Sequence, residues 1–217
     1  MLFYPIGIKH SLVLSDSMVR GFRQLKKTDV ICRRGADPKK LFNYIQDNKY
    51  IVARNYKVVI IHIGTNYFGS RYEWGKYLEL VNQECTFEEY YDYINSSSLL
   101  PAKASTFTFR DEVFKIIKLI QSLSTSFILL SGIIPRPWDI ERRQPIVKRF
   151  NQVLKSLESE EDRVIYIETP KVFHTKDGEI VTRYFDWDGL HLNEEGSKQL
   201  QSLFGEKIWT IIDKYCL

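Results

Sequence analysis

The chain has 217 residues, of which 44% are hydrophobic and 27% are charged, and its formal net charge is +4. These values are ordinary for a globular protein, and the length is most simply that of one domain over 1–217. The sequence has no run of about 18 apolar residues, which excludes a membrane-spanning helix.

Short apolar runs alternate with helical patterns in the first third of the chain. Two features stand out: the continuous β-branched run at 57–63 is typical of a strand buried on both faces, and Asp37 suits a helix N-cap that Pro38 follows. In chain order the patterns predict a strand at 10–14, a helix at 18–27, a strand at 29–32, a helix at 37–48 and a strand at 57–63.

The alternation is interrupted by an aromatic-rich connection at about 67–108, which we treat as an insertion in the domain. Within it, Glu84 to Ile94 fits a helix capped by Thr86. Long connections with structure of their own are usually functional. A lid or pocket wall and a packing or self-association surface are equally open interpretations. The alternation then resumes with a helix at 111–123, a strand at 127–131, a helix at 142–157, a strand at 164–167 and a helix at 193–214.

Strands that alternate with helices predict an α/β fold, with a central parallel five-stranded sheet between two layers of helices. In such sheets a site forms at the carboxyl ends of the strands. Ser17 follows the first predicted strand, Gly35 the second and Asn66 the third, while Asp188 and His191 follow the fifth. We therefore expect these five residues at one edge of the sheet.

The segment Asp188-Gly189-Leu190-His191 places an acid three residues before a histidine, in a loop ahead of the last helix. With Ser17 it offers a nucleophile, a general base and an acid that orients the base, the three roles of a hydrolytic triad. Asp186 is a rival acid, and the spacing to His191 favours Asp188. Taken singly, Ser17 could be a helix N-cap and the pair could be surface residues.

Two further residues are candidates for stabilising an oxyanion. Gly35 would donate its backbone N–H and Asn66 its side-chain amide, although both residue types are also common in turns. His62, inside an apolar run, is interpreted as a hydrogen-bonded core or near-site residue. The sequence has no HExxH, no paired CxxC and no phosphate-binding glycine motif, so neither a metal nor a cofactor is expected. It also lacks the GxSxG elbow of α/β-hydrolases.

Together these blocks resemble the SGNH (GDSL-type) hydrolase superfamily, named for serine, glycine, asparagine and histidine in chain order. The matching residues are Ser17, Gly35, Asn66 and His191. The resemblance implies a flavodoxin-like fold and a metal-free serine esterase, with an oxyanion hole formed by the Ser17 and Gly35 amides and the Asn66 side chain. The chain departs from the family pattern in three ways: Ser15 replaces the usual glycine of the first block, Tyr67 replaces the common aspartate after the asparagine, and the insertion after Asn66 is longer than in compact acetylhydrolase-like members.

A narrower similarity concerns three phrases, at 59–66, 131–137 and 185–192. They resemble the esterase domains of animal retrotransposon polyproteins, which implies that the chain is one part of a longer protein. Cysteine usage points to a reducing compartment, because Cys32, Cys85 and Cys216 are widely spaced and form no metal-type pair. The first 15 residues lack a cationic start and a cleavage site, so we predict an intracellular, cytoplasmic protein without a secretory signal.

We therefore predict a serine esterase acting on small acyl esters, acetyl first; a carbohydrate or lipid deacetylase would share the mechanism. The alternative is a lipid- or nucleic-acid-binding module of a retroelement protein with a secondary or vestigial esterase site. It rests on a basic stretch between residues 20 and 40, for which a solvated surface is the simpler interpretation. The candidate contacts are Arg20, Arg23, Lys26, Lys27, Arg33 and Arg34.

Overall fold

Five short strands pair as one parallel sheet in the order β2-β1-β3-β4-β5. The computed structural model describes residues 10–22, 25–67, 106–137 and 144–215. This strand order is that of flavodoxin-like folds, so the predicted fold class is confirmed. The strands are β1 (Ser11–Ser15), β2 (Thr28–Cys32), β3 (Val58–His62), β4 (Phe127–Ser131) and β5 (Val164–Ile167).

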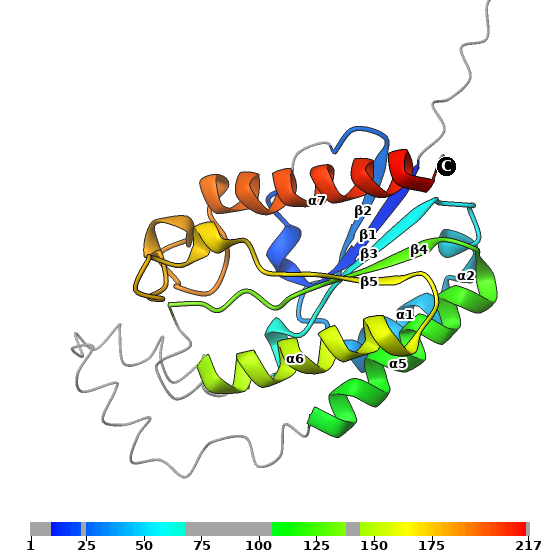
Figure 1. Ribbon diagram of the computed structural model, residues 1–217, viewed down its shortest axis with the longest axis horizontal. Helices are drawn as coiled ribbons and strands as arrows, with labels where there is room; N and C mark the ends of the chain where they lie inside the picture. The colour runs from blue at the N-terminus through cyan, green and yellow to red at the C-terminus, as the bar shows by residue number, and fades with distance from the viewer. Residues whose placement is uncertain (1–9, 23–24, 68–105, 138–143, 216–217) are drawn as a thin grey trace, which may run out of the picture.

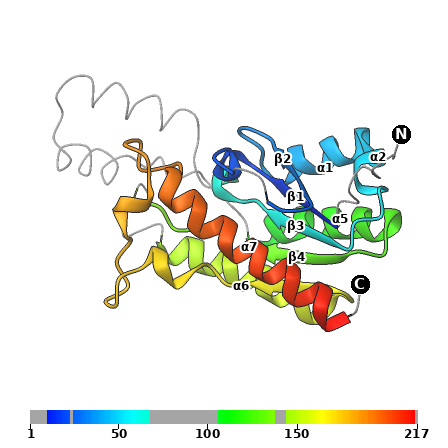
Figure 2. The ribbon, with the colours of Figure 1, turned by 90° about the horizontal axis from the view of Figure 1, so that it is seen from above.

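Helices cover both faces of the sheet and complete three layers (Figure 1). Helices α1, α5 and α6 lie on one face, and the long terminal helix α7 crosses the other, as the view from above also shows (Figure 2). None of the described helices combines the length and apolar character that a bilayer span requires. Their bounds are α1 (Pro38–Asp47), α2 (Lys49–Val52), α5 (Thr106–Leu123), α6 (Gln144–Glu160) and α7 (Glu194–Tyr215).

The strands divide their side chains between two cores because successive residues of a strand point to opposite faces. In β1, Leu12 and Leu14 pack toward α1 and α5, whereas Val13 packs toward α7, and all three are fully buried. Burial on both faces explains why the sequences of β1, β3 and β4 are largely continuous apolar runs instead of alternating patterns. The helix ends also follow the sequence, since Asp37 accepts a hydrogen bond from the backbone of Lys40 and caps α1.

The predicted helix at 18–27 is wrong. Among the described residues between β1 and β2, the one helical element is the 3-10 turn η1 (Ser17–Val19), and Lys27 has a positive φ of 54° just before β2. Helix α7 covers this segment so closely that a Cβ on Gly21 would lie 2.6 Å from Ser197 Oγ. A helix about 10 Å wide has no room between this segment of the sheet and α7, which explains why no α-helix forms among the described residues here.

Other differences concern helix boundaries. Helix α5 begins at Thr106, inside the segment expected to belong to the aromatic insertion, and the short α2 is an addition to the predicted elements. The helix expected over 84–94, with Thr86 as its cap, lies outside the described residues. Strands β4 and β5 and, within about two residues, α7 have their predicted bounds.

The carboxyl ends of β1 and β3 are neighbours at the point where the strand order reverses. Such a switch point is where parallel α/β sheets form their sites, because the loops leaving the two strands diverge there. The loop after β1 begins at Asp16 and the loop after β3 contains η2 (Thr65–Tyr67). These two loops and the segment after β5 supply the candidate site.

Candidate active site

Ser17 is the first residue of η1 and lies at the end of β1, at the edge of the sheet. Asp16 caps this turn, since its Oδ1 accepts a hydrogen bond from the Met18 amide at 3.0 Å. The turn is held by its surroundings, because Met18 is buried under α7 and the thiol of Cys32 donates to the Asp16 carbonyl. Ser17 is itself only 7% exposed, so its hydroxyl is fixed on a buried support.

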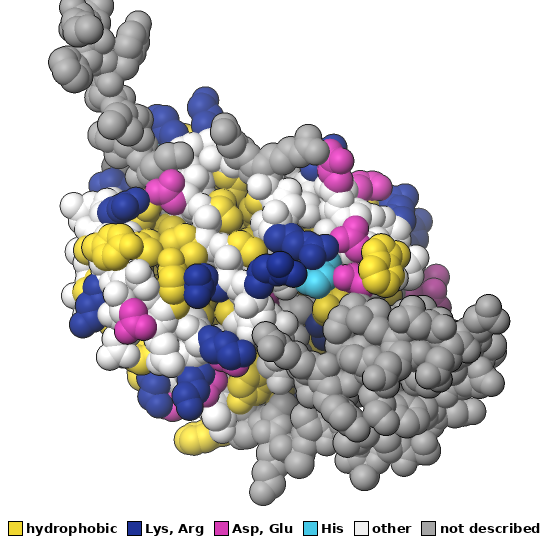
Figure 3. All heavy atoms as spheres, turned by 180° about the vertical axis from the view of Figure 1, so that it is seen from behind, with side chains coloured by type: hydrophobic (Ala, Val, Ile, Leu, Met, Phe, Trp, Pro, Cys, Tyr) yellow, Lys and Arg dark blue, Asp and Glu magenta, His cyan; other side chains and the backbone are white. Residues whose placement is uncertain are grey.

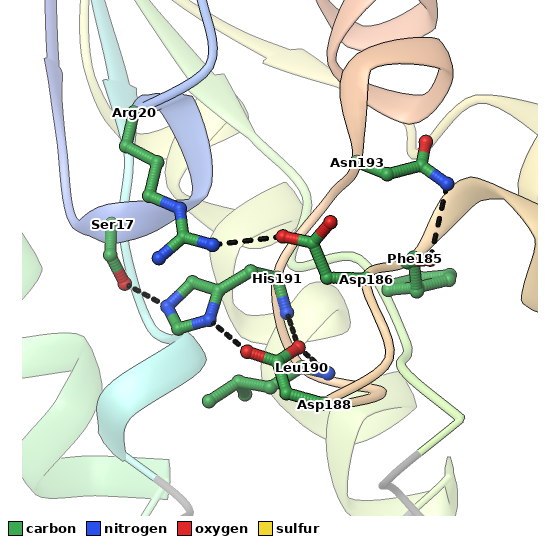
Figure 4. Close-up of polar contacts among 8 residues, drawn as sticks. All are labelled: Ser17, Arg20, Phe185, Asp186, Asp188, Leu190, His191 and Asn193. Carbon is green, nitrogen blue, oxygen red and sulfur yellow. Dashed lines mark hydrogen bonds and ion pairs between the residues drawn. The ribbon is translucent and has the colours of Figure 1, made fainter.

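His191 and Asp188 meet Ser17 from a turn 174 residues farther along the chain (Figure 4). The Ser17 Oγ and His191 Nε2 atoms are 3.0 Å apart, and His191 Nδ1 lies 2.6 Å from Asp188 Oδ2. The other carboxylate oxygen of Asp188 accepts the backbone N–H groups of Leu190 and His191, both at 2.9 Å. The three side chains therefore form one continuous hydrogen-bonded series.

The electrostatics of the series favour a charged carboxylate at Asp188. Burial on its own raises the pKa of Asp188, but the hydrogen bonds from the His191 ring and from the His191 and Leu190 amides outweigh it, and the net pKa is lowered. A carboxylate that stays ionised accepts the Nδ1 proton of the imidazole and leaves Nε2 free to accept from Ser17. This is the tautomer a general base requires.

Asp186, the other candidate acid, forms an ion pair with Arg20 and does not contact the His191 ring. Its Oδ2 lies 2.8 Å from the Arg20 guanidinium, and its backbone N–H donates to the His191 carbonyl at 2.8 Å. The chain from Phe185 to Leu192 thus closes as a small bridge in which Asp186 and Asp188 point to different places. Of the two carboxylates, only Asp188 contacts the histidine ring.

Gly35 and Asn66 lie on adjoining loops. The Asn66 side-chain amide donates to the Ala36 carbonyl at 3.1 Å, which ties the loop after β3 to the loop after β2. Gly35 has a φ of 66°, a left-handed conformation that favours glycine, and its carbonyl accepts a hydrogen bond from Lys40. The Asn66 side-chain amide is therefore engaged in holding the two loops together.

Two buried charged residues beside the site were missed by the sequence reasoning. Asp16 is fully buried and Arg136 is 2% exposed, and Arg136 donates to the Thr65 carbonyl. Burial raises the pKa of Asp16 to about 6, against the lowering effects of the Met18 amide, the Thr65 hydroxyl and the charge of Arg136. The sequence did carry a signal, because Asp16 adjoins Ser17 and Arg136 stands between two prolines after a buried strand.

Asp16 makes the free energy of unfolding depend on pH. Its carboxyl stays protonated up to about pH 6 in the folded chain, against an ordinary pKa of 3.8. The folded state then binds more protons, so this contribution to stability is complete below pH 3.8 and is lost as the pH rises through about 6. Asp16→Asn keeps the acceptor for Met18 and removes the titration. Relative to the unsubstituted chain, we expect its free energy of unfolding to gain up to roughly 3 kcal/mol between acidic and neutral pH.

The measurement is urea unfolding of both chains at several pH values. His62 works in the opposite direction, because burial lowers its pKa to about 4 and its contribution is lost as the pH falls from 6.5 through 4. His62 is present in both chains, so its contribution cancels when the unfolding free energy of the unsubstituted chain is subtracted from that of the variant. A difference in unfolding free energy that stays constant with pH would contradict the role assigned to Asp16.

His62 lies in the core beneath the site, as expected for a hydrogen-bonded core residue. Its Nδ1 is 2.9 Å from Ser131 Oγ, and its ring packs edge-on against Phe204 of α7. Its Nε2 has no hydrogen-bond partner among the described residues. Within the same residues, no group of three or more histidine, cysteine or acidic side chains is arranged to hold a metal ion.

On one face of the molecule, arginine and lysine side chains gather beside a histidine (Figure 3). The side chains of the basic stretch are only partly free of partners within the chain. Arg20 is paired with Asp186, the Lys27 ammonium contacts His10, and the Arg33 guanidinium lies 4.4 Å from the centre of the Tyr44 ring. Lys26 and Arg34 are exposed, and Arg23 lies outside the described residues.

A flavodoxin-like sheet that carries a serine, a histidine and an aspartate at its carboxyl edge is the architecture of the SGNH class of hydrolases. The chain belongs to the GDSL-like lipase/acylhydrolase family, whose sequence model matches residues 17–204. The match spans the Ser17 turn and His191 and ends inside α7. No curated protein sequence matches the chain.

Solved structures of similar fold include a GDSL-like lipase from Bacteroides thetaiotaomicron, with a TM-score of 0.64 and 11% identity over 93% of this chain and 88% of that one. An acetyl xylan esterase, AlAXEase, has a TM-score of 0.63 and 12% identity over 91% and 98%. A lipase/acylhydrolase from Enterococcus faecalis has a TM-score of 0.58 and 14% identity over 91% and 94%. At such identities these likenesses support the fold.

Proposed function

We propose that the protein is a serine esterase that hydrolyses small acyl esters, acetyl esters first. The observation that carries the proposal is the hydrogen-bonded series from Asp188 through His191 to Ser17. Ser17 is the nucleophile, His191 the general acid and base, and Asp188 the group that holds the ring and stabilises its charged form. Family membership supports the same class of reaction.

The reaction would proceed in two halves. Ser17 Oγ attacks the acyl carbon while His191 Nε2 takes its proton, and the negative charge on the carbonyl oxygen is met by the amides of Ser17 and Gly35 and by Asn66. The C–O bond to the alcohol then breaks, and the alcohol leaves with the proton from Nε2. Water next attacks the acyl-enzyme with Nε2 as base. The acid is released and the Ser17 hydroxyl is restored.

The test is the release of p-nitrophenol from p-nitrophenyl esters of increasing acyl length. We expect the highest kcat/KM for the acetate. The similarity in fold to an acetyl xylan esterase is consistent with this preference. A purified, folded protein that hydrolyses none of these esters above the buffer rate would contradict the esterase proposal, and a maximum at long chains would contradict the acetyl preference alone.

Asn66→Ala is expected to lower kcat by roughly 10²- to 10³-fold with little change in KM, because an oxyanion donor acts mainly on the transition state. The substitution also removes the contact with Ala36. Asn48→Ala is a matched control. The Asn48 side-chain amide also donates to a backbone carbonyl, that of Tyr44, over a distance of 2.9 Å, and this hydrogen bond lies at the end of α1 and not in the candidate site. If both variants keep the rate of the unsubstituted chain, Asn66 is not an oxyanion donor.

A second candidate function is binding of an anionic lipid or nucleic acid through the basic stretch. The exposure of Lys26 and Arg34 favours it, and the esterase site would then be secondary. Binding to anionic vesicles or to an oligonucleotide that weakens with salt and persists in Ser17→Ala would support this function. Equal binding to neutral vesicles, without salt dependence, would contradict it.

The esterase proposal includes a narrower one about origin: that the chain is an esterase domain of a retrotransposon polyprotein. It is supported by the phrases at 59–66, 131–137 and 185–192. The genomic sequence around the coding region is the test. We expect further open reading frames of a retroelement, a reverse transcriptase among them, next to this domain. A single-copy gene without such neighbours would contradict the proposal.

A further inference from the structure

The turn that carries Ser17 and the turn that carries His191 are joined by a second contact. Arg20 Nη2 lies 2.8 Å from Asp186 Oδ2, and this ion pair spans the same two turns as the hydrogen bond between Ser17 and His191. Figure 4 shows the two contacts running alongside one another. Residues 166 apart in sequence therefore meet beside the reacting groups.

Each partner is anchored to the backbone of the residue it would position. The Arg20 amide donates to the Ser17 carbonyl at 3.2 Å, within the turn that presents the nucleophile. The Asp186 amide donates to the His191 carbonyl at 2.8 Å, and the Asp186 carbonyl accepts from Gly189. A movement of the Arg20 backbone therefore also moves Ser17, and a movement of the Asp186 backbone also moves His191.

We propose that Arg20 and Asp186 are positioning residues that keep the nucleophile and the base in register during the reaction. The inference rests on the proposed esterase function. Once Ser17 is acylated, its Oγ has no hydrogen to give to His191, and the bond between them is lost until water restores the hydroxyl. The ion pair does not involve the reacting atoms, so it persists through this interval and holds the base where water must be activated.

The size of the effect follows from where the pair lies. Arg20 and Asp186 are partly exposed, with 40% and 32% of their side-chain surfaces accessible, and such pairs add little to overall stability. Catalysis is far more sensitive, since a displacement of about 1 Å can cost up to about 100-fold in rate. We expect Arg20→Ala and Asp186→Asn each to lower kcat by about tenfold, without a change in KM for a neutral ester.

The experiment measures kcat and KM for p-nitrophenyl acetate in both variants, in the double variant and in Arg20→Lys. If the two residues act as a unit, the double variant loses no more than either single one, and Arg20→Lys recovers most of the rate. The matched control is Lys155→Ala, which removes an exposed ion pair, 3.2 Å long, between Lys155 on α6 and Glu168, the residue after β5. The control should retain the kcat of the unsubstituted chain.

Three outcomes would overturn the proposal: unchanged kcat in Arg20→Ala, additive losses in the double variant, or a raised KM with unchanged kcat. The last would make Arg20 a substrate contact instead of a positioning residue. Labelling of each variant with a fluorophosphonate distinguishes a failure of the positioning proposal from a failure of the esterase proposal. Slower labelling that still reaches one adduct per chain at Ser17 supports the role, whereas labelling of no variant at Ser17 removes the esterase function itself.

Discussion

Ser17→Ala is expected to abolish ester hydrolysis and to leave the fold intact. Under the proposed mechanism, the variant loses the oxygen that would attack the acyl carbon and the proton that His191 would accept. In hydrolases of this kind, loss of the nucleophile lowers kcat on the order of 10⁶-fold. The side chain is small, and its turn is held by the Asp16 cap and by burial of Met18, neither of which needs the Ser17 hydroxyl, so the thermal unfolding midpoint should change little.

The measurement combines turnover with covalent labelling. A fluorophosphonate should attach to a single peptide of the unsubstituted chain, which contains Ser17, and should not label Ser17→Ala. Ser15→Ala is the matched control, because Ser15 is buried two residues upstream and its hydroxyl has no partner among the described residues. Hydrolysis by Ser17→Ala at the rate of the unsubstituted chain would end the assignment of the nucleophile.

The sheet was predictable because its strands are short apolar runs, of which the central β3 is β-branched and buried throughout, a pattern set by local composition. From the strand order it follows that Ser17, Asn66 and His191 lie at one edge, since parallel strands end together. The expected helix at 18–27 failed for a non-local reason. Its place is taken by α7, which comes from the other end of the chain and packs against Gly21.

The choice between Asp186 and Asp188 shows where the sequence is insufficient. Both acids precede His191 by a few residues, and either could reach its ring in some turn conformation. The bridge between Phe185 and Leu192 decides the matter by directing Asp188 inward and Asp186 toward Arg20. The partner of Asp186 lies 166 residues away, and nothing in the local sequence indicates that pairing.

The burial of the polar residues beneath the site also depends on contacts between distant parts of the chain. Asp16 has a raised pKa because it is fully buried, and the two polar residues that act against this rise, Thr65 and Arg136, come from distant parts of the chain. A sequence pattern can place Asp16 next to Ser17, but burial is a property of the assembled layers. Spacing therefore predicts which residue types meet at the edge, and packing decides their charge states.

Asp188→Asn is expected to lower kcat by about 10⁴-fold while the turn keeps its shape. The amide oxygen can still accept the backbone N–H groups of Leu190 and His191, which hold this turn in the unsubstituted chain. Its NH₂ group would then face His191 Nδ1 and keep the proton on Nε2. An imidazole in that tautomer cannot take the proton of Ser17, so binding is preserved and the chemical step is lost. Steady-state kinetics with p-nitrophenyl acetate measures the loss.

Asp186→Asn is the natural comparison, because it makes the same chemical change two residues away in the same turn. If Asp188 orients the base and Asp186 only positions the turn, the first substitution should cost about 10⁴-fold and the second about tenfold. Equal losses would mean that the carboxylates share one role. A larger loss at Asp186 would reverse their assignments, since the ion pair with Arg20 would then matter more to catalysis than the bond to the imidazole ring.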